Sequence, residues 1–133
     1  MKRWLAIGSL ALATVLVSGS GGYGEPREEL KNFMLVKLKH SQKVLEGLVM
    51  EDFPEIAKHA QDLSLLSLAE TWQVLQTPEY VDYSRKFRNA ADTLSDMAKK
   101  RDLTGATMAF NQVTTKCVEC HKYVRGVRMA EAK

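Results

Sequence analysis

The two cysteines of the chain stand three residues apart and are followed directly by a histidine, in the order Cys117-Val118-Glu119-Cys120-His121. On a helix, residues three and four apart share one face, so these three side chains project together. Two thiols so placed can add to the two vinyl groups of a porphyrin while the imidazole reaches the iron axially. Cys-x-x-Cys-His is the attachment signature of c-type haem. The motif therefore predicts one covalent haem c, attached through Cys117 and Cys120 and ligated by His121.

Three other chemistries can use the same cysteines. A disulfide between them closes so short a loop that it would stabilise the chain little. A thioredoxin-like redox pair is expected at a helix N-terminus beside a strand, whereas this pair falls within a predicted helix. A zinc site could combine the motif with a distant His40 or His59, although ligands so close on one rigid helix fit a tetrahedron poorly. Haem is the favoured interpretation.

Residues 1–24 have the order of a secretory signal peptide. Lys2 and Arg3 form a short positive region, Trp4 to Val17 is mostly apolar, and Ser18 to Gly24 is small, polar and glycine-rich. An apolar run of about 14 residues is short for a membrane span, which needs roughly 20. We therefore expect a cleaved signal peptide, no stable membrane span and a periplasmic location. Export agrees with the haem motif, because covalent haem attachment takes place outside the cytoplasm.

The remaining residues, 25–133, are expected to form one domain. Of the 19 basic side chains only Lys2 and Arg3 are lost with the signal peptide, which leaves 17 basic and 16 acidic side chains. This balance lacks the basic excess of a nucleic-acid-binding protein. No Ser/His/Asp set, phosphate-binding glycine loop or carboxylate pair stands out as catalytic, so we do not expect an enzyme.

Apolar residues recur every three or four positions after residue 25, which predicts helices. The expected blocks are 26–50, about 52–75, about 77–101 and about 102–126. Asp52 and the sequence Thr77-Pro78-Glu79 resemble N-terminal caps. Four amphipathic helices with short connections favour an all-α, up-down-up-down four-helix bundle.

Two helical faces matter for the site. The last block places the cysteine and histidine motif on its apolar stripe, so we expect His121 to face the bundle interior. The first block is expected to turn one face inward, formed by Leu30, Met34, Leu38, Ser41, Leu45 and Leu48.

A four-helix bundle with Cys-x-x-Cys-His on its last helix, near the C-terminus, resembles the cytochrome c-prime family. The resemblance rests on Cys117, Cys120 and His121, and on Arg125 four residues after the histidine. An aromatic residue commonly precedes that arginine in the family, whereas Val124 does here. The resemblance implies a monohaem electron carrier with redox partner proteins. Related bundles often pair through their first two helices, so a homodimer is a further expectation.

The family's low-spin members take a second axial ligand from the first helix, two or three turns from its start, where this chain has Met34. The resemblance therefore implies a His121/Met34 iron, and a thioether ligand raises the reduction potential. A methionine at helical spacing is also ordinary core packing. In that case Phe33 and Leu38 could cap an open iron face that binds nitric oxide or another diatomic gas. Arg125 could pair with a haem propionate or face solvent.

The other polar candidates are two histidines and a lysine. His40 falls off the apolar stripe and is expected to be exposed, and His59 is expected to be partly buried with a polar partner. Lys37 borders the stripe, but we do not expect an amine ligand. Four aromatic residues could line the pocket or belong to the core: Trp72, Tyr80, Tyr83 and Phe87.

Overall fold

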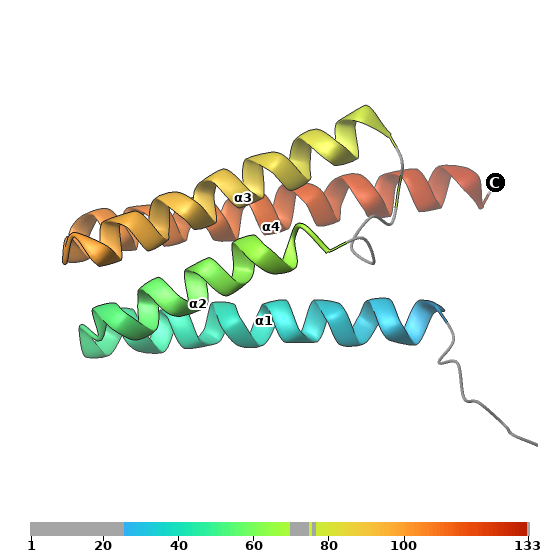
Figure 1. The fold of residues 1–133 in the computed structure, drawn as a ribbon. Helices are drawn as coiled ribbons and strands as arrows, with labels where there is room; N and C mark the ends of the chain where they lie inside the picture. The colour runs from blue at the N-terminus through green and yellow to red at the C-terminus, as the bar shows by residue number, and fades with distance from the viewer. Residues whose placement is uncertain (1–25, 70–74, 76, 133) are drawn as a thin grey trace, which may run out of the picture.

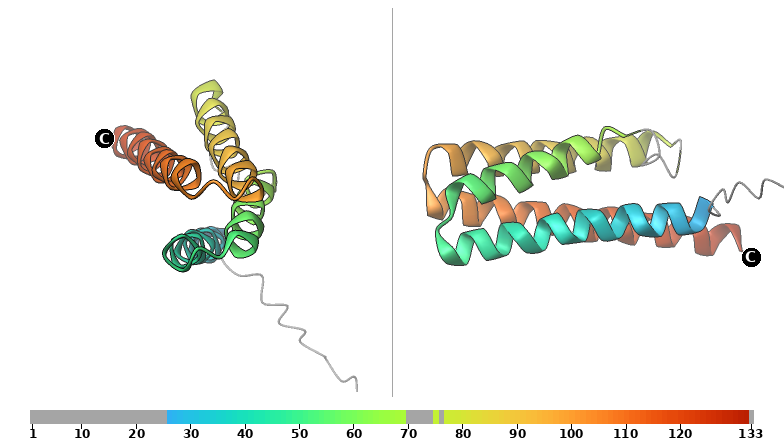
Figure 2. Two further views of the ribbon diagram at one scale, coloured as in Figure 1. Left: turned by 90° about the vertical axis from the view of Figure 1, so that its left-hand side faces the viewer. Right: turned by 60° about the horizontal axis from the view of Figure 1, so that its bottom comes forward.

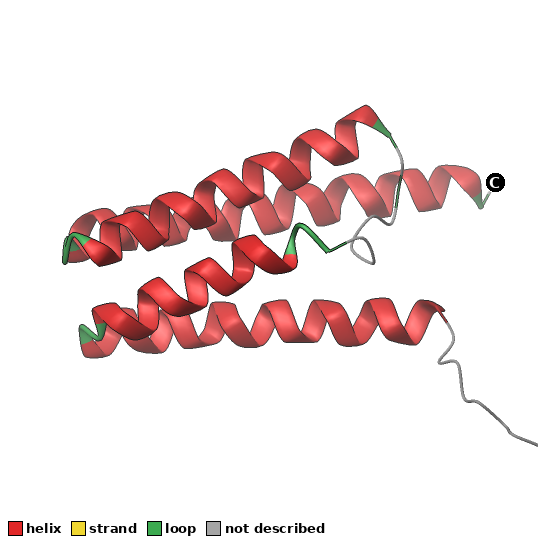
Figure 3. Ribbon diagram, in the orientation of Figure 1, coloured by secondary structure: helices red, strands yellow, loops and turns green. Residues whose placement is uncertain are grey.

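The computed structural model describes residues 26–69, 75 and 77–132, and these form four helices in the order α1 (Pro26–Met50), α2 (Phe53–Leu66), α3 (Pro78–Lys99) and α4 (Leu103–Glu131) (Figure 1). Consecutive helices run in opposite directions, and the described residues contain no strand (Figure 3). The all-α, up-down-up-down four-helix bundle is thereby confirmed. The predicted signal peptide, residues 1–24, lies outside the described residues.

The helix starts follow the expected capping chemistry. Asp52, Thr77 and Asp102 each accept a hydrogen bond from the backbone N–H three residues further on, at 2.8 to 3.2 Å. Such caps satisfy backbone donors that have no partner inside the helix. The carboxylate of Glu55, in the first turn of α2, lies 3.1 Å from His59 Nε2.

Two helix ends differ from the sequence prediction. The α2 helix ends at Leu66 and not near residue 75, because the N–H of Ser67 bonds to the carbonyl of Ser64, three residues back, and the two following N–H groups do the same. This tighter pattern is that of a 3₁₀ turn. The α4 helix continues to Glu131, past the end expected at Gly126. Gly126 has no positive φ, and a single exposed glycine costs a helix only about 1 kcal/mol.

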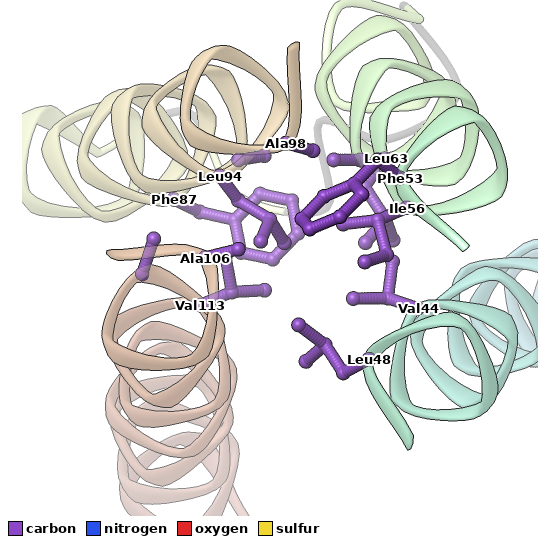
Figure 4. Packing of buried hydrophobic residues seen from close by; sticks show 13 residues of the cluster. Val44, Leu48, Phe53, Ile56, Leu63, Phe87, Leu94, Ala98, Ala106 and Val113 are labelled. Atoms are coloured by element: carbon purple, nitrogen blue, oxygen red, sulfur yellow. The ribbon is translucent and has the colours of Figure 1, made fainter. Parts of the chain in front are cut away.

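The packed core lies toward the end of the bundle that contains the turn from α1 to α2 and the turn from α3 to α4 (Figure 4). Its buried members come from all four helices: Val44, Leu48, Phe53, Ile56, Ala60, Leu63, Phe87, Ala91, Leu94, Ala98, Ala106, Ala109 and Val113. The inward face of α3 is formed by buried residues at helical spacing: Tyr80, Ser84, Phe87, Ala91, Leu94, Ser95 and Ala98. Apolar burial of this kind is the main stabilising contribution to a small bundle.

The inward face of α1 is rotated from the predicted stripe. Leu38 and Leu45 are about half exposed, whereas Lys37 and Val44 are buried. Residues three and four positions apart both lie on one face of a helix. After Met34 the buried face of α1 continues three residues later, at Lys37, and not four residues later, at Leu38. A lysine therefore occupies a position at which the pattern of leucines had predicted an apolar residue.

The four helices do not close evenly around the core. Neighbouring pairs α1 and α2, α2 and α3, and α3 and α4 pack along much of their length, but α1 and α4 contact each other far less. In the end-on view α3 and α4 diverge from the end nearest the viewer (Figure 2). The side of the bundle between α1 and α4 is therefore the most open one.

Candidate haem-binding site

A cavity of about 220 Å³ lies beside the core, and the core residues Leu63 and Phe87 form part of its wall. Its lining comes from all four helices: Met34, Lys37, Leu38, Ser41, Leu63, Tyr83, Ser84, Phe87, Lys116, Cys117, Cys120 and His121. A second cavity, of about 150 Å³, shares Met34, Cys120 and His121 with the first. Together they reach the lower part of the roughly 300 to 1,000 Å³ range typical of cofactor sites. The motif of α4 and Met34 of α1 thus line the same space.

The two cysteines lie on an unbroken stretch of α4 and carry free thiols. Cys120 is buried and Cys117 is partly buried, and both line the larger cavity. Burial raises the pKa of each thiol, and the positive charge of Lys37 opposes that rise. Reactive redox cysteines have lowered pKa values, so this environment does not favour a thioredoxin-like pair.

His121 lies at the edge of the cavities and not at the centre of the inward stripe. His121 as a whole residue is exposed to solvent, whereas Cys120 is the most buried residue of the motif. The expectation that position 121 faces the interior is therefore corrected: the inward stripe runs through position 120 here. Partial burial of the ring lowers the pKa of His121, and the charges of Arg125 and Lys37 lower it further. A neutral imidazole is the form that binds a metal ion.

Met34 is partly buried on α1 and lines both cavities. It lies on the opposite helix from His121, across the open side of the bundle. Leu38 also lines the larger cavity while remaining 53% exposed, whereas Phe33 lines neither of the two cavities. Of the two residues considered as a cap for an open iron face, only Leu38 is in position for that role.

Arg125 is exposed and lines neither cavity, although its charge acts on the His121 ring. Its pairing with a haem propionate stays a prediction. Arg128, which the sequence patterns did not single out, lines the smaller cavity. It follows Arg125 by three residues, so both guanidinium groups lie on the same side of α4.

Lys37 is the cavity residue whose position sequence reasoning missed. It is buried, its Nζ donates a hydrogen bond to Ser67 Oγ at 3.0 Å, and Nζ lies 3.8 Å from the centre of the Phe87 ring. Burial lowers the pKa of this amine to about 7, against a weaker raising effect of the two cysteines. The signal was available, because Lys37 lies three residues after Met34 and four before Ser41, in register with the inward face.

The aromatic residues fall into two groups. Tyr83 and Phe87 line the larger cavity, and Tyr80 lines the smaller one. The Tyr83 ring lies 5.3 Å from the Tyr123 ring, and the Tyr123 and Thr77 hydroxyls share a hydrogen bond of 2.8 Å. These contacts join the motif region of α4 to the start of α3. Trp72, also considered for the pocket, lies outside the described residues.

The two remaining histidines do not join the cysteines. The expectation that His40 is exposed is wrong: its Nδ1 lies 2.9 Å from His59 Nδ1, and the side chain is only 22% exposed. His59 is partly buried with a carboxylate partner, as expected. Neither histidine lines the cavity that holds Cys117 and Cys120, so the four-ligand zinc site that would combine them is not formed.

No family model, curated protein or solved structure matches this chain. Among the described residues, no helix combines the length and the apolar character that crossing a membrane requires.

Proposed function

We propose that the protein is a periplasmic electron-transfer cytochrome with a single covalent haem c. The observation that carries this proposal is that Cys117, Cys120 and His121 line one cavity together with Met34 from the opposite helix. A haem-attachment motif and a candidate second axial ligand thus face a common space. The resemblance to the cytochrome c-prime family supports the same conclusion.

The protein residues fit this cofactor in three respects. The cavity walls include Leu63, Tyr83 and Phe87, which can cover an apolar ring system and exclude water. Burial raises the pKa values of both cysteine thiols, which disfavours their charged thiolate forms inside the cavity. The open side between α1 and α4 gives a cofactor access to this cavity, whose inner wall is formed in part by the core residues Leu63 and Phe87.

Each residue of the site has a separate role in this proposal. Cys117 and Cys120 would hold the cofactor through thioether bonds, and His121 would hold its iron through a neutral imidazole. Met34 would offer a thioether sulfur as the second iron ligand. Haem supplies one-electron oxidation and reduction of its iron, and the protein contributes orientation, burial and tuning of the potential.

The ligand pair is tested by replacing Met34 with leucine in the haem-loaded protein. Leucine keeps an apolar side chain of similar size but removes the sulfur, so the visible spectrum should change from low-spin to high-spin. The weak red band of sulfur-to-iron charge transfer should disappear with it. Met97→Leu is the matched control. Met97 packs against the core and lines neither cavity, so its replacement should not affect the spectrum. A low-spin Met34→Leu spectrum would remove Met34 from the iron.

One second function is favoured by a specific observation, the buried amine of Lys37 in the same cavity. If the iron is five-coordinate, Lys37 could donate a hydrogen bond to nitric oxide or another bound diatomic gas. A wild-type protein with a broad high-spin spectrum that shifts when nitric oxide is added would support this gas-binding alternative. A low-spin spectrum unchanged by nitric oxide would support electron transfer.

A further inference from the structure

A second group of ligand-type side chains lies outside the haem-binding cavity, between α1 and α2. His40 of α1 faces His59 and Asp62 of α2, with the two histidine rings 5.0 Å apart between centres. The two Nδ1 atoms are 2.9 Å apart, and Asp62 Oδ2 lies 3.4 Å from His40 Nδ1 and 3.6 Å from His59 Nδ1. Within the described part of the chain, this is the one group of three such side chains whose ligand atoms converge.

The triangle formed by these three atoms has the dimensions of one face of a zinc tetrahedron. Zinc binds histidine nitrogen and carboxylate oxygen at about 2.0 to 2.2 Å. Tetrahedral angles then place neighbouring ligand atoms about 3.3 to 3.6 Å apart. The observed separations of 3.4 and 3.6 Å lie in that range, and the separation of 2.9 Å is somewhat shorter. An ion just outside the plane of the three atoms can therefore reach all of them.

Hydrogen bonding within the group accounts for the contact between the two histidines but not for the approach of Asp62 to both of them. Each Nδ1 has a single in-plane site, which holds either a proton or a lone pair. A proton shared between the two nitrogens occupies both of those sites. Asp62 Oδ2 nevertheless approaches both nitrogens, although it has no proton of its own to offer when ionised. A cation at the common point gives all three atoms a partner.

Glu55 supplies the outer support that metal-binding histidines usually have. Its Oε2 lies 3.1 Å from His59 Nε2, so a proton on Nε2 leaves the lone pair on Nδ1, which faces the group. The charged groups around the site are Asp62, Glu55, Lys39 and Lys58.

We propose that His40, His59 and Asp62 bind one divalent transition-metal cation, Zn²⁺, which joins α1 to α2. The fourth coordination position faces a shallow pocket lined by Leu65, Leu66 and Ala69 beside His40 and Asp62, where water or a small anion completes the tetrahedron. Two nitrogens and one oxygen with an open position are a ligand set that zinc uses. The site is separate from the haem-binding cavity and does not depend on the proposed electron-transfer function.

The site is tested by calorimetric titration of the mature, haem-loaded protein with zinc chloride in a non-chelating buffer. We expect one equivalent to bind. His40→Gln and His59→Gln should each weaken binding by on the order of 100-fold, and Glu55→Gln by at least about tenfold, because it orients a ligand. Glu46→Gln is the matched control: Glu46 is an exposed carboxylate paired with Lys43, outside the group, and its loss should leave binding unchanged.

Two further measurements keep this proposal distinct from the haem proposal. The Cys117→Ser/Cys120→Ser chain, checked for helix content by circular dichroism, should still bind one zinc ion when no haem is attached. Zinc should raise the thermal unfolding midpoint of the wild type and leave that of folded His59→Gln unchanged. Absence of binding at millimolar zinc, or an affinity equal to that of the wild type in both histidine variants, would overturn the site. So would loss of binding in the double cysteine variant.

Discussion

Replacing Lys37 with methionine is the perturbation for which the structure gives the clearest magnitude. The Lys37 amine is only 7% exposed, and burial lowers its pKa from 10.5 to about 7. At 1.36 kcal/mol per pH unit, keeping this lysine charged in the folded, haem-free chain costs at most roughly 4 to 5 kcal/mol. Methionine has a similar length and no charge, so Lys37→Met should be more stable than wild type at pH 6.

The pH dependence follows from the direction of that shift. Because the folded pKa lies below the unfolded one, the unfolded chain binds more protons between pH 7 and about 10.5, and stability rises with pH in that interval. Below pH 7 both states hold the proton and Lys37 adds no slope. Between pH 6 and pH 8.5 the titration of Lys37 should raise the free energy of unfolding of the wild type by about 2 kcal/mol. The gap between Lys37→Met and wild type should therefore narrow by about 2 kcal/mol over this range.

Urea unfolding of the reduced, haem-free chain at several pH values measures this difference. The lowered pKa of His40 does not depend on Lys37 and cancels in the comparison, whereas the Lys37 charge also lowers the pKa of His121, so both proteins are compared in a His121→Gln background. Lys31→Met is the matched control, since Lys31 is exposed on the same helix and its replacement should leave the profile unchanged. Parallel pH profiles for wild type and Lys37→Met would refute the reasoning, as would a variant less stable than wild type at pH 6.

Three other variants test the bundle itself by urea unfolding. Gly126→Ala should raise the free energy of unfolding by roughly 0.5 to 1 kcal/mol, because alanine favours a helix interior and the added methyl group meets no atom within 4 Å. An unchanged or lower free energy of unfolding would contradict a helix that continues through residue 126. Leu94→Ala should lower the free energy of unfolding by about 2 to 5 kcal/mol without altering the haem spectrum. A changed spectrum would contradict the placement of Leu94 in the core and outside the cavity wall. Tyr123→Phe should cost about 1 kcal/mol through the lost hydrogen bond to Thr77, and Tyr123→Phe in a Thr77→Val background should cost less.

Local sequence signals were sufficient for most of the fold. Asp52, Thr77 and Asp102 each mark a helix start because a cap depends on residues only three positions apart. The inward face of α3 was also predictable, since its buried residues keep an unambiguous spacing. The ends of α2 and α4 were harder to place. The turn at Ser67 includes a hydroxyl that accepts from Lys37, thirty residues away, and no local pattern reports such a contact.

The candidate site was predicted in its motif and incompletely in its surroundings. Cys117, Cys120 and His121 are adjacent in sequence, so their common face followed from helix geometry alone. Lys37 was misjudged because the leucine pattern hid the rotation of α1. His40 was misjudged because its partners, His59 and Asp62, come from another helix and are brought close only by the packing of α1 against α2.

The intact mass of the mature protein tests the central claim most directly. The protein is expressed with an export signal in cells that carry the haem-attachment machinery, unfolded in acid, and weighed beside a c-type cytochrome matured in the same cells. We expect the mass of the polypeptide plus one haem, and the bare polypeptide mass for Cys117→Ser/Cys120→Ser. A bare wild-type polypeptide, from cells in which the reference cytochrome carries its haem, would contradict the claim.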